Sequence, residues 1–179
     1  MKRVFLIHGW EGRPDNHWFP WLKRELEARY IKVFAPAMPN PTHPNLDEWI
    51  MMIRDWVGEI DPETFFVGHS LGCIAILKYL ERTKINAKFG TAVFVGGFKD
   101  DINEKELFEF TRDPLDFEKI KGKGNFVSIA SDNDEQVTLS ASMALAHALD
   151  SKIIVLKGKG HFCKSDGVVS LPEVLEALL

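Results

Sequence analysis

Residues 64–80, Thr-Phe-Phe-Val-Gly-His-Ser-Leu-Gly-Cys-Ile-Ala-Ile-Leu-Lys-Tyr-Leu, decide the fold class of this chain. The apolar run Thr64–Val67 predicts a buried β-strand, and Cys73–Leu80 predicts the helix that follows it. Between them lies a Gly-x-Ser-x-Gly pattern centred on Ser70. Glycines two residues before and after the serine remove side chains that would collide in a sharp turn from strand to helix. The segment therefore predicts an α/β protein in which the Ser70 hydroxyl projects alone from the turn.

The same alternation of strand and helix continues along the chain. Short runs rich in Val, Ile and Phe alternate with longer segments of helical period, which indicates a mostly parallel sheet with helices on both faces, a three-layer sandwich. The expected strands are Arg3–Ile7, Ile31–Ala35, Thr64–Val67, Thr91–Val95, Asn125–Ala130 and Lys152–Leu156. The expected helices are Trp18–Arg29, Leu46–Val57, Ser70–Arg82, Thr138–Leu149 and Leu171–Leu178.

Two of these helices are preceded by a capping signal. Asn45 lies three residues before Glu48, and Ser170 lies three residues before Glu173. A small polar side chain can accept a hydrogen bond from the first turn of a helix, while the acid bonds back to it. We therefore expect both pairs to form capping boxes.

Length and charge restrict the class of protein. The 179 residues, 45% of them hydrophobic, suit a single domain over 1–179. With 22 Lys and Arg against 26 Asp and Glu, and no basic run, nucleic-acid binding is not expected.

No apolar stretch is long enough for a membrane span, and Val4–Ile7 is too short for a signal-peptide core. Cys73 and Cys163 offer no disulfide framework, so we expect a cytoplasmic protein with both cysteines in packing roles.

Residues 98–123 differ from the rest of the chain in composition. Eight of these residues are acidic and six are basic, about twice the charged fraction of the whole chain, which is 27%. Apolar residues such as Phe98, Leu107 and Phe117 interrupt the charges, so the segment is amphipathic. The simpler interpretation is a surface helix with a solvated face. The alternative is a small lid over a site at the carboxyl edge of the sheet.

A serine hydroxyl is a weak nucleophile at neutral pH, so Ser70 needs a general base and an acid that orients the base. In strand–turn–helix serine enzymes the chain order is serine, acid, histidine, which leaves His147 and His161 as bases. His147 falls on an expected helix. His161 follows the last strand in a glycine-rich loop, at the sheet edge where ligands bind in open α/β sheets. We therefore predict Ser70 as nucleophile and His161 as general base.

The acid is expected in the loop after the fifth strand, where Asp132, Asp134 and Glu135 compete. We favour Asp134, with Asp132 as the alternative, because Asp132 lies closer to the strand and suits a turn-forming role. The loop does not match a calcium site, since Val137 stands where that site needs a glycine. The two Gly-Lys-Gly turns of the chain lack the rest of a nucleotide-binding fingerprint. No metal and no cofactor is therefore expected.

The turn after the first strand, His8–Gly12, is the natural place for a second oxyanion donor. We expect the backbone N–H groups of Leu71 and Trp10 to form the donor pair, and we interpret the His8 side chain as a packing residue. Large side chains near the nucleophile are expected to form the walls of the substrate pocket. These expected pocket residues are Trp10, His69, Phe98 and Phe162.

Six short motifs carry a resemblance to a known family: His8–Trp10, Pro39–Pro41, Gly68–Gly72, Asp113–Phe117, Asp134–Val137 and Gly160–Phe162. Together they resemble the α/β-hydrolase superfamily and, within it, the small serine hydrolases of the retinoblastoma-binding serine hydrolase family. The resemblance spans nearly the whole chain. It implies a minimal α/β-hydrolase fold with six strands in the order 2-1-3-4-5-6. It also implies a Ser70, Asp134 and His161 triad that hydrolyses carboxylic esters.

We therefore expect a serine esterase that acts on a small-molecule ester. A short acyl chain is expected, because a domain of this size leaves little room for a deep cap. The same triad would serve an amidase, a peptidase or a thioesterase, which only substrate profiling separates. A non-catalytic protein-binding module on the same fold is a further alternative, because a fold does not determine a function.

Overall fold

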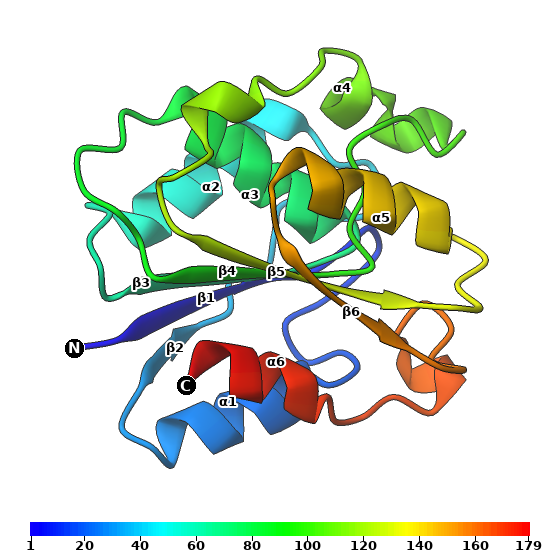
Figure 1. Cartoon of the computed structure of the whole chain (residues 1–179), viewed down its shortest axis with the longest axis horizontal. Coiled ribbons are helices and arrows are strands. Elements are labelled where there is room, and N and C mark those ends of the chain that lie inside the picture. Colours follow the sequence, from blue (N-terminus) through cyan, green and yellow to red (C-terminus); the bar gives the residue numbers. More distant parts are fainter.

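The computed structural model describes all 179 residues and contains one six-stranded sheet in which every neighbouring pair is parallel. The strand order is β2-β1-β3-β4-β5-β6, as expected (Figure 1). Because all strands run the same way, their carboxyl ends meet at one edge of the sheet. The strands are β1 (Arg3–Ile7), β2 (Lys32–Phe34), β3 (Thr64–His69), β4 (Thr91–Val95), β5 (Asn125–Ser131) and β6 (Lys152–Leu156).

Helices cover both faces of this sheet, which confirms the three-layer α/β sandwich (Figure 1). One face carries α1 (Phe19–Glu27) and α6 (Pro172–Leu178). The other face carries α2 (Leu46–Val57), α3 (Leu71–Arg82) and α5 (Leu139–Ala148). None of the helices combines the length and the apolar character that crossing a membrane requires.

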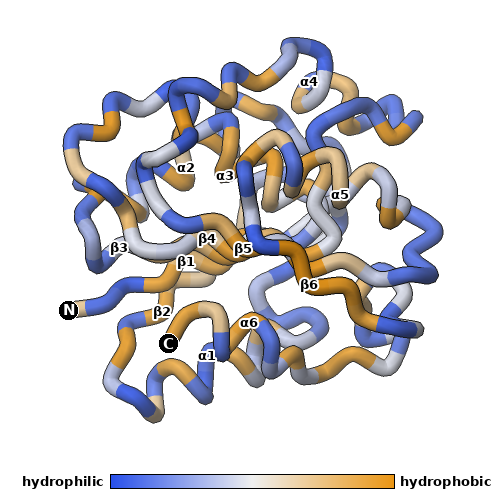
Figure 2. Tube along the Cα trace, viewed as in Figure 1, coloured by the Kyte–Doolittle hydropathy of each residue, from blue (hydrophilic) through white to orange (hydrophobic).

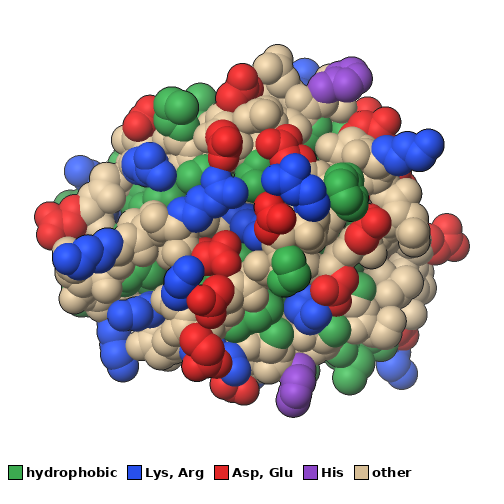
Figure 3. All heavy atoms as spheres, turned by 90° about the horizontal axis from the view of Figure 1, so that it is seen from above, with side chains coloured by type: hydrophobic (Ala, Val, Ile, Leu, Met, Phe, Trp, Pro, Cys, Tyr) green, Lys and Arg blue, Asp and Glu red, His purple; other side chains and the backbone are tan.

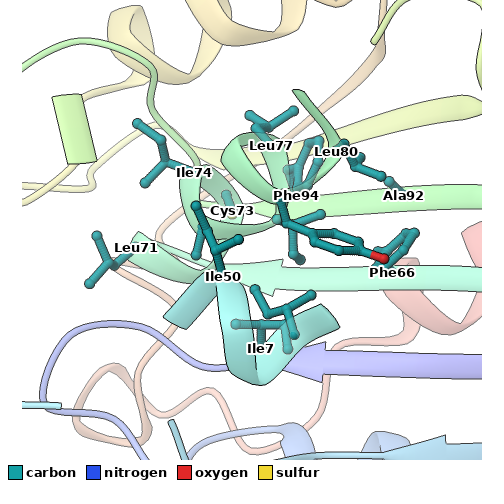
Figure 4. Close-up of a cluster of buried hydrophobic side chains, with 14 of the residues drawn as sticks. Ile7, Ile50, Phe66, Leu71, Cys73, Ile74, Leu77, Leu80, Ala92 and Phe94 are labelled. Atoms are coloured by element: carbon teal, nitrogen blue, oxygen red, sulfur yellow. The ribbon is translucent and has the colours of Figure 1, made fainter. Parts of the chain in front are cut away.

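Two hydrophobic cores hold the layers together. The larger core has 31 buried residues, and Figure 4 shows side chains of α2 and α3 meeting those of the sheet there, among them Ile50, Leu77 and Phe94. The smaller core has 19 buried residues and lies under α1 and α6. Figure 2 shows the apolar residues gathered along the central strands and on the helix sides that face them. Burial of these residues supplies the main favourable free energy of folding.

The edge strands depart from the expectation that every strand is covered on both faces. β3 is buried at every position, whereas β2 and β6 contain no fully buried residue. Val155 of β6 is 46% exposed. An edge strand has a neighbour on one side only, and its apolar run alone does not reveal this position.

Neither pair forms the full capping box that was expected, and only Asn45 caps its helix. Asn45 Oδ1 accepts a hydrogen bond from the Glu48 N–H (3.0 Å), so Asn45 caps α2. The expectation for Ser170 is wrong: Leu171 is the N-cap residue of α6 and no side chain caps it. Pro172 explains the difference, because proline at the first position of a helix has no N–H that needs an acceptor.

Residues 98–123 form short helical turns, so the interpretation as one surface helix is wrong. The segment contains η1 (Lys105–Leu107), α4 (Phe108–Thr111) and η2 (Phe117–Lys119). Pro114 disfavours a helical Asp113 and so limits α4. The apolar residues Leu107, Phe110, Leu115 and Ile120 are buried. Acidic and basic side chains are interspersed on the outer surface of this side of the molecule (Figure 3).

Two side chains of α3 bind the backbone of this segment. Lys78 is 2% exposed, and its Nζ donates a hydrogen bond to Asp113 O (2.5 Å). Glu81 Oε1 accepts a hydrogen bond from the Asp116 N–H (2.6 Å). The other carboxylate oxygen of Glu81, Oε2, lies 3.7 Å from Lys78 Nζ. The segment is therefore attached to α3 by polar contacts as well as by its buried apolar side chains.

Candidate active site

Ser70 lies in the turn between β3 and α3 and belongs to neither element. Its backbone has φ 52° and ψ −119°, a conformation that residues other than glycine rarely adopt. The Ser70 N–H donates to Val95 O at the end of β4 (2.9 Å), which holds the turn against the carboxyl edge of the sheet. The sharp strand-to-helix turn predicted by the sequence is confirmed.

Glycines are required around this turn because backbone atoms leave no space for a side chain. A Cβ added to Gly68 would lie 2.7 Å from Cys73 Cα, and one added to Gly72 would collide with Ile7 O of β1. Neither glycine has a positive φ. Space rather than backbone freedom therefore explains both glycines of the Gly-x-Ser-x-Gly pattern.

The structure brings His161 and Asp134 together from two different loops. His161 Nδ1 lies 2.8 Å from Asp134 Oδ2, and both side chains are buried. Asp134 Oδ1 accepts from the N–H groups of Gln136 and Val137, each at 2.9 Å, so the carboxylate is held at both oxygens. A carboxylate can only accept, so His161 Nδ1 carries the proton and the neutral ring has a free lone pair on Nε2.

Asp132 has a different role from Asp134. Its Oδ1 accepts from the Gly158 N–H (2.8 Å), and Asn133 Oδ1 accepts from the Gly160 N–H (2.9 Å). These contacts support the loop that carries His161, but Asp132 is exposed and forms no hydrogen bond with the imidazole. His147, the other histidine considered as a base, is exposed on α5.

Ser70 and His161 line one cavity at the carboxyl edge of the sheet, with a volume of about 270 Å³. His161 forms hydrogen bonds with Asp134, His69 and Cys163 but none with Ser70. Catalytic hydrogen bonds are often long or poorly aligned in a substrate-free enzyme, so the shared cavity is the relevant observation.

The His8 side chain forms hydrogen bonds that hold the loop His8–Gly12, which was expected to supply an oxyanion donor. His8 Nε2 accepts from the Met38 N–H (3.0 Å), which places its proton on Nδ1, and Nδ1 donates to Gly9 O (2.8 Å). Burial lowers the pKa of His8, which keeps the ring neutral. Because Gly9 C=O and Trp10 N–H belong to one planar peptide, this bond also fixes the direction of the Trp10 N–H. His8 therefore does more than pack the loop.

Both expected oxyanion donors have unused N–H groups. The Trp10 N–H forms no hydrogen bond within the protein. Leu71 is the first residue of α3 and so has no acceptor within that helix. The positive end of the α3 dipole lies at the same place. The two backbone groups are thus available to an anion formed beside Ser70.

Two of the four expected pocket residues do not line the cavity. Trp10 and His69 border it, and Trp10 Nε1 donates to Thr42 O (3.1 Å), which fixes the ring. Phe98 and Phe162 are fully buried, Phe98 in the larger core and Phe162 in the smaller one. Phe98 and Phe162 were expected in the pocket because they lie close in sequence to the loops of the site. Both rings are instead packed in the interior.

Sequence reasoning missed several residues that border the cavity. Three of them, Ile102, Glu104 and Leu107, come from the segment 98–123, so this segment does border the site. The other residues that border the cavity lie in loops that contain one of the sequence motifs. Their position next to a motif was the only feature of the sequence that could have indicated them. These are Glu11, Asn16, His17, Gln136 and Cys163.

Neither cysteine has the properties of a nucleophile. Burial raises the pKa of the Cys73 thiol far above its ordinary value. Burial and the nearby Asp166 raise the pKa of Cys163 to about 11. Both thiols are therefore protonated at neutral pH. No group of three or more His, Cys, Asp or Glu side chains gathers as metal ligands would.

Comparison with known proteins relates this arrangement to a family. The model of the family described as Serine hydrolase matches residues 4–179. YdeN of Bacillus subtilis (strain 168) is 35% identical over 179 residues, which cover 99% of this chain and 94% of YdeN. The serine hydrolase RBBP9 of Rattus norvegicus is 26% identical over 164 residues, covering 90% of this chain and 87% of RBBP9.

Solved structures agree with the sequence comparison. The crystal structure of the ydeN gene product from B. subtilis matches with a TM-score of 0.96 at 36% identity, covering 99% of this chain and 97% of the other. Est1E from Butyrivibrio proteoclasticus matches with a TM-score of 0.70 at 14% identity, covering 99% and 88%, and shares the fold alone.

The strand order, the Gly-x-Ser-x-Gly turn and these structural matches give this protein an α/β-hydrolase fold. Within that class, the chain belongs to the serine hydrolase family. The resemblance drawn from the sequence motifs is therefore confirmed, and the protein is a hydrolase.

Proposed function

We propose that this hydrolase is an esterase that cleaves small carboxylic esters through a covalent acyl-enzyme on Ser70. His161 is the general base in this proposal and Asp134 is the acid that orients it. One observation carries the proposal: a buried His161–Asp134 pair at 2.8 Å borders the same cavity as a serine in a strained turn.

The proposed reaction has two steps. Ser70 Oγ attacks the ester carbonyl and transfers its proton to His161 Nε2, while the N–H groups of Leu71 and Trp10 stabilise the oxyanion. The C–O bond of the ester then breaks, and His161 returns the proton to the leaving alcohol. In the second step water attacks the acyl-serine, its proton passes through His161 to Ser70, and the carboxylic acid leaves.

The size and lining of the cavity support a short acyl group. Its volume of about 270 Å³ lies at the lower end of ligand pockets. Trp10, Ile102 and Leu107 supply apolar surface, whereas His17 and Gln136 supply polar groups. We therefore propose substrates with a small apolar acyl group rather than a long chain.

We also propose that residues 1–179 work as one domain and that the segment 98–123 acts as a small lid. The contribution of Ile102, Glu104 and Leu107 to the cavity supports the lid. The attachment of this segment to Lys78 and Glu81 of α3 indicates where the lid would be anchored.

The test compares the parent protein with Ser70→Ala on p-nitrophenyl esters from acetate to octanoate. We expect the parent to prefer the shorter chains and Ser70→Ala to lose at least about 10⁴-fold in kcat. A fluorophosphonate probe should label the parent at Ser70. Equal hydrolysis by both proteins would refute the nucleophile. Labelling without ester turnover would instead favour an amidase, peptidase or thioesterase, and no labelling would favour a binding module.

Asp134→Asn and Asp132→Asn separate the two candidate acids. Asparagine at position 134 favours the wrong His161 tautomer, so we expect kcat to fall by about 10⁴-fold. Asp132→Asn keeps an oxygen that can accept from Gly158, so we expect a change in kcat of less than about threefold. The reverse result would assign the acid to Asp132.

A further inference from the structure

His69 stands next to the nucleophile but has no part in the proposed reaction. It is the last residue of β3, it is 3% exposed, and it borders the cavity. The large majority of buried polar side-chain atoms in proteins have a hydrogen-bond partner. The partner of His69 therefore indicates its role.

The partner of His69 is the backbone of the proposed general base. His69 Nε2 lies 2.8 Å from His161 O. A carbonyl oxygen can only accept, so His69 Nε2 carries the proton and donates it. Burial and the nearby His161 lower the pKa of His69 well below its ordinary value of 6.5, so the ring stays neutral and keeps this tautomer.

The His69 ring also contacts the other loops of the site. Its centroid lies 4.9 Å from that of His161, 5.4 Å from that of His17 and 6.2 Å from that of Trp18. A Cβ added to Gly9, in the oxyanion loop, would lie 3.7 Å from His69 Nδ1. His69 therefore lies between the loop that follows β1 and the loop that follows β6.

The loop that carries His161 is held from two sides. Side chains of β5 and the following turn accept from its N–H groups at Gly158, Lys159 and Gly160. On the other side, the His161 carbonyl accepts from His69, with only the weak Cys163 thiol donor at 3.6 Å in addition. His69 is thus the strong donor that fixes the peptide of His161 itself.

We propose that His69 is a positioning residue, whose Nε2–H holds the His161 backbone so that the imidazole faces Ser70 and Asp134 together. The inference rests on the proposed function, in which His161 is the base. A loss of this donor lets the His161 loop shift, and misplacement of a catalytic group by about 1 Å costs on the order of 10²-fold in rate.

The test uses three variants of the full chain. His69→Gln keeps an N–H donor, and His69→Phe keeps an aromatic ring without a donor. His69→Leu takes the place of His69→Phe if the larger phenyl ring prevents folding. We expect kcat for a p-nitrophenyl ester to fall about 10²-fold in His69→Phe or His69→Leu, with KM nearly unchanged. His69→Gln should recover most of the loss.

A second measurement does not depend on turnover. The His161 Nδ1 proton shared with Asp134 should give a downfield proton NMR resonance in the parent and in His69→Gln. We expect it to broaden or disappear in the variants without a donor. One combined outcome is that the parent protein cleaves no ester while the resonance is present in the parent and lost in His69→Phe. That combination would refute the proposed substrate and support the positioning role.

Any of three results would overturn the inference. One is a His69→Phe or His69→Leu protein with parental kcat and an intact His161 resonance. A second is a rise in KM at constant kcat, which would make His69 a substrate contact. A His69→Gln protein no better than the donor-free variants would likewise show that the hydrogen bond does not position His161.

Discussion

The nucleophile turn, residues 68–72, and the segment 98–123 border the same cavity but are built in opposite ways. In the turn, backbone lies against backbone, and a Cβ at Gly68 or Gly72 would have no space. The segment 98–123 is held by buried side chains and by two polar contacts to α3, while its charged residues face solvent. The turn that would perform the chemistry has no space for a side chain at its two glycines, whereas the segment that borders the substrate is held by side chains.

The largest effect is expected where the turn contacts β1. Gly72→Ala places a Cβ against Ile7 O, and relief requires movement of the backbone of α3 or β1. We expect the free energy of unfolding in urea to fall by about 3 kcal/mol or more. Gly122→Ala in the segment 98–123 is the control, because it has φ 72° and open space around it. Its strain should cost only about 1 kcal/mol. Equal losses would contradict the contrast between the two regions.

The attachment of the segment 98–123 should depend on Lys78. Lys78→Met removes the buried donor to Asp113 O, so we expect a loss of about 2 kcal/mol in urea unfolding and faster amide exchange over residues 105–120. Lys119→Met is the matched control, since Lys119 is exposed and pairs with Asp116 at 3.4 Å. It should change stability by less than about 0.5 kcal/mol. Unchanged exchange in Lys78→Met would show that the apolar contacts alone hold the segment.

The buried histidine behind the turn should make stability depend on pH. The pKa of His69 is lower in the folded protein than the ordinary 6.5 of an unfolded chain, so the unfolded state binds more protons as the pH falls below about 6.5. Stability is therefore lost on acidification. Between pH 7 and pH 5 we expect His69→Gln to lose about 1 to 2 kcal/mol less than the parent in urea unfolding. Parallel pH profiles would show that His69 does not contribute.

The smallest effect is expected in substrate preference. Ile102→Ala enlarges the cavity from the side of the segment 98–123, so kcat/KM for butyrate relative to acetate esters should rise by tenfold or less. Phe108→Ala is the control, because Phe108 is 52% exposed in the same segment and does not border the cavity. An equal shift in both variants would mean that the whole segment, rather than its contact with the cavity, alters the preference.

Local patterns sufficed for much of the fold and for part of the site. Apolar runs and helical periods located all six strands and the helices that cover them. Gly68 and Gly72 predicted the turn at Ser70, and the glycine-rich loop after the last strand singled out His161. Such signals are local, because each depends on residues that are close together in the sequence.

Pairings between distant loops could not be predicted in this way. The choice between Asp134 and Asp132 depended on which carboxylate reaches His161, 27 residues from Asp134. The hydrogen bond from His69 to His161 joins residues that are 92 positions apart. The burial of Phe98 and Phe162 also followed from the packing of the loops against the two cores.

The sequence by itself determined the layered sheet, the strained turn at Ser70 and the serine hydrolase family. Only the tertiary structure decided which acid meets His161, which side chains border the cavity, and how His8 and His69 hold the loops around it. The physical reason is that periodicity and glycine spacing act through neighbouring residues. The orientation of a side chain at the sheet edge depends instead on hydrogen bonds and packing between loops that folding brings together.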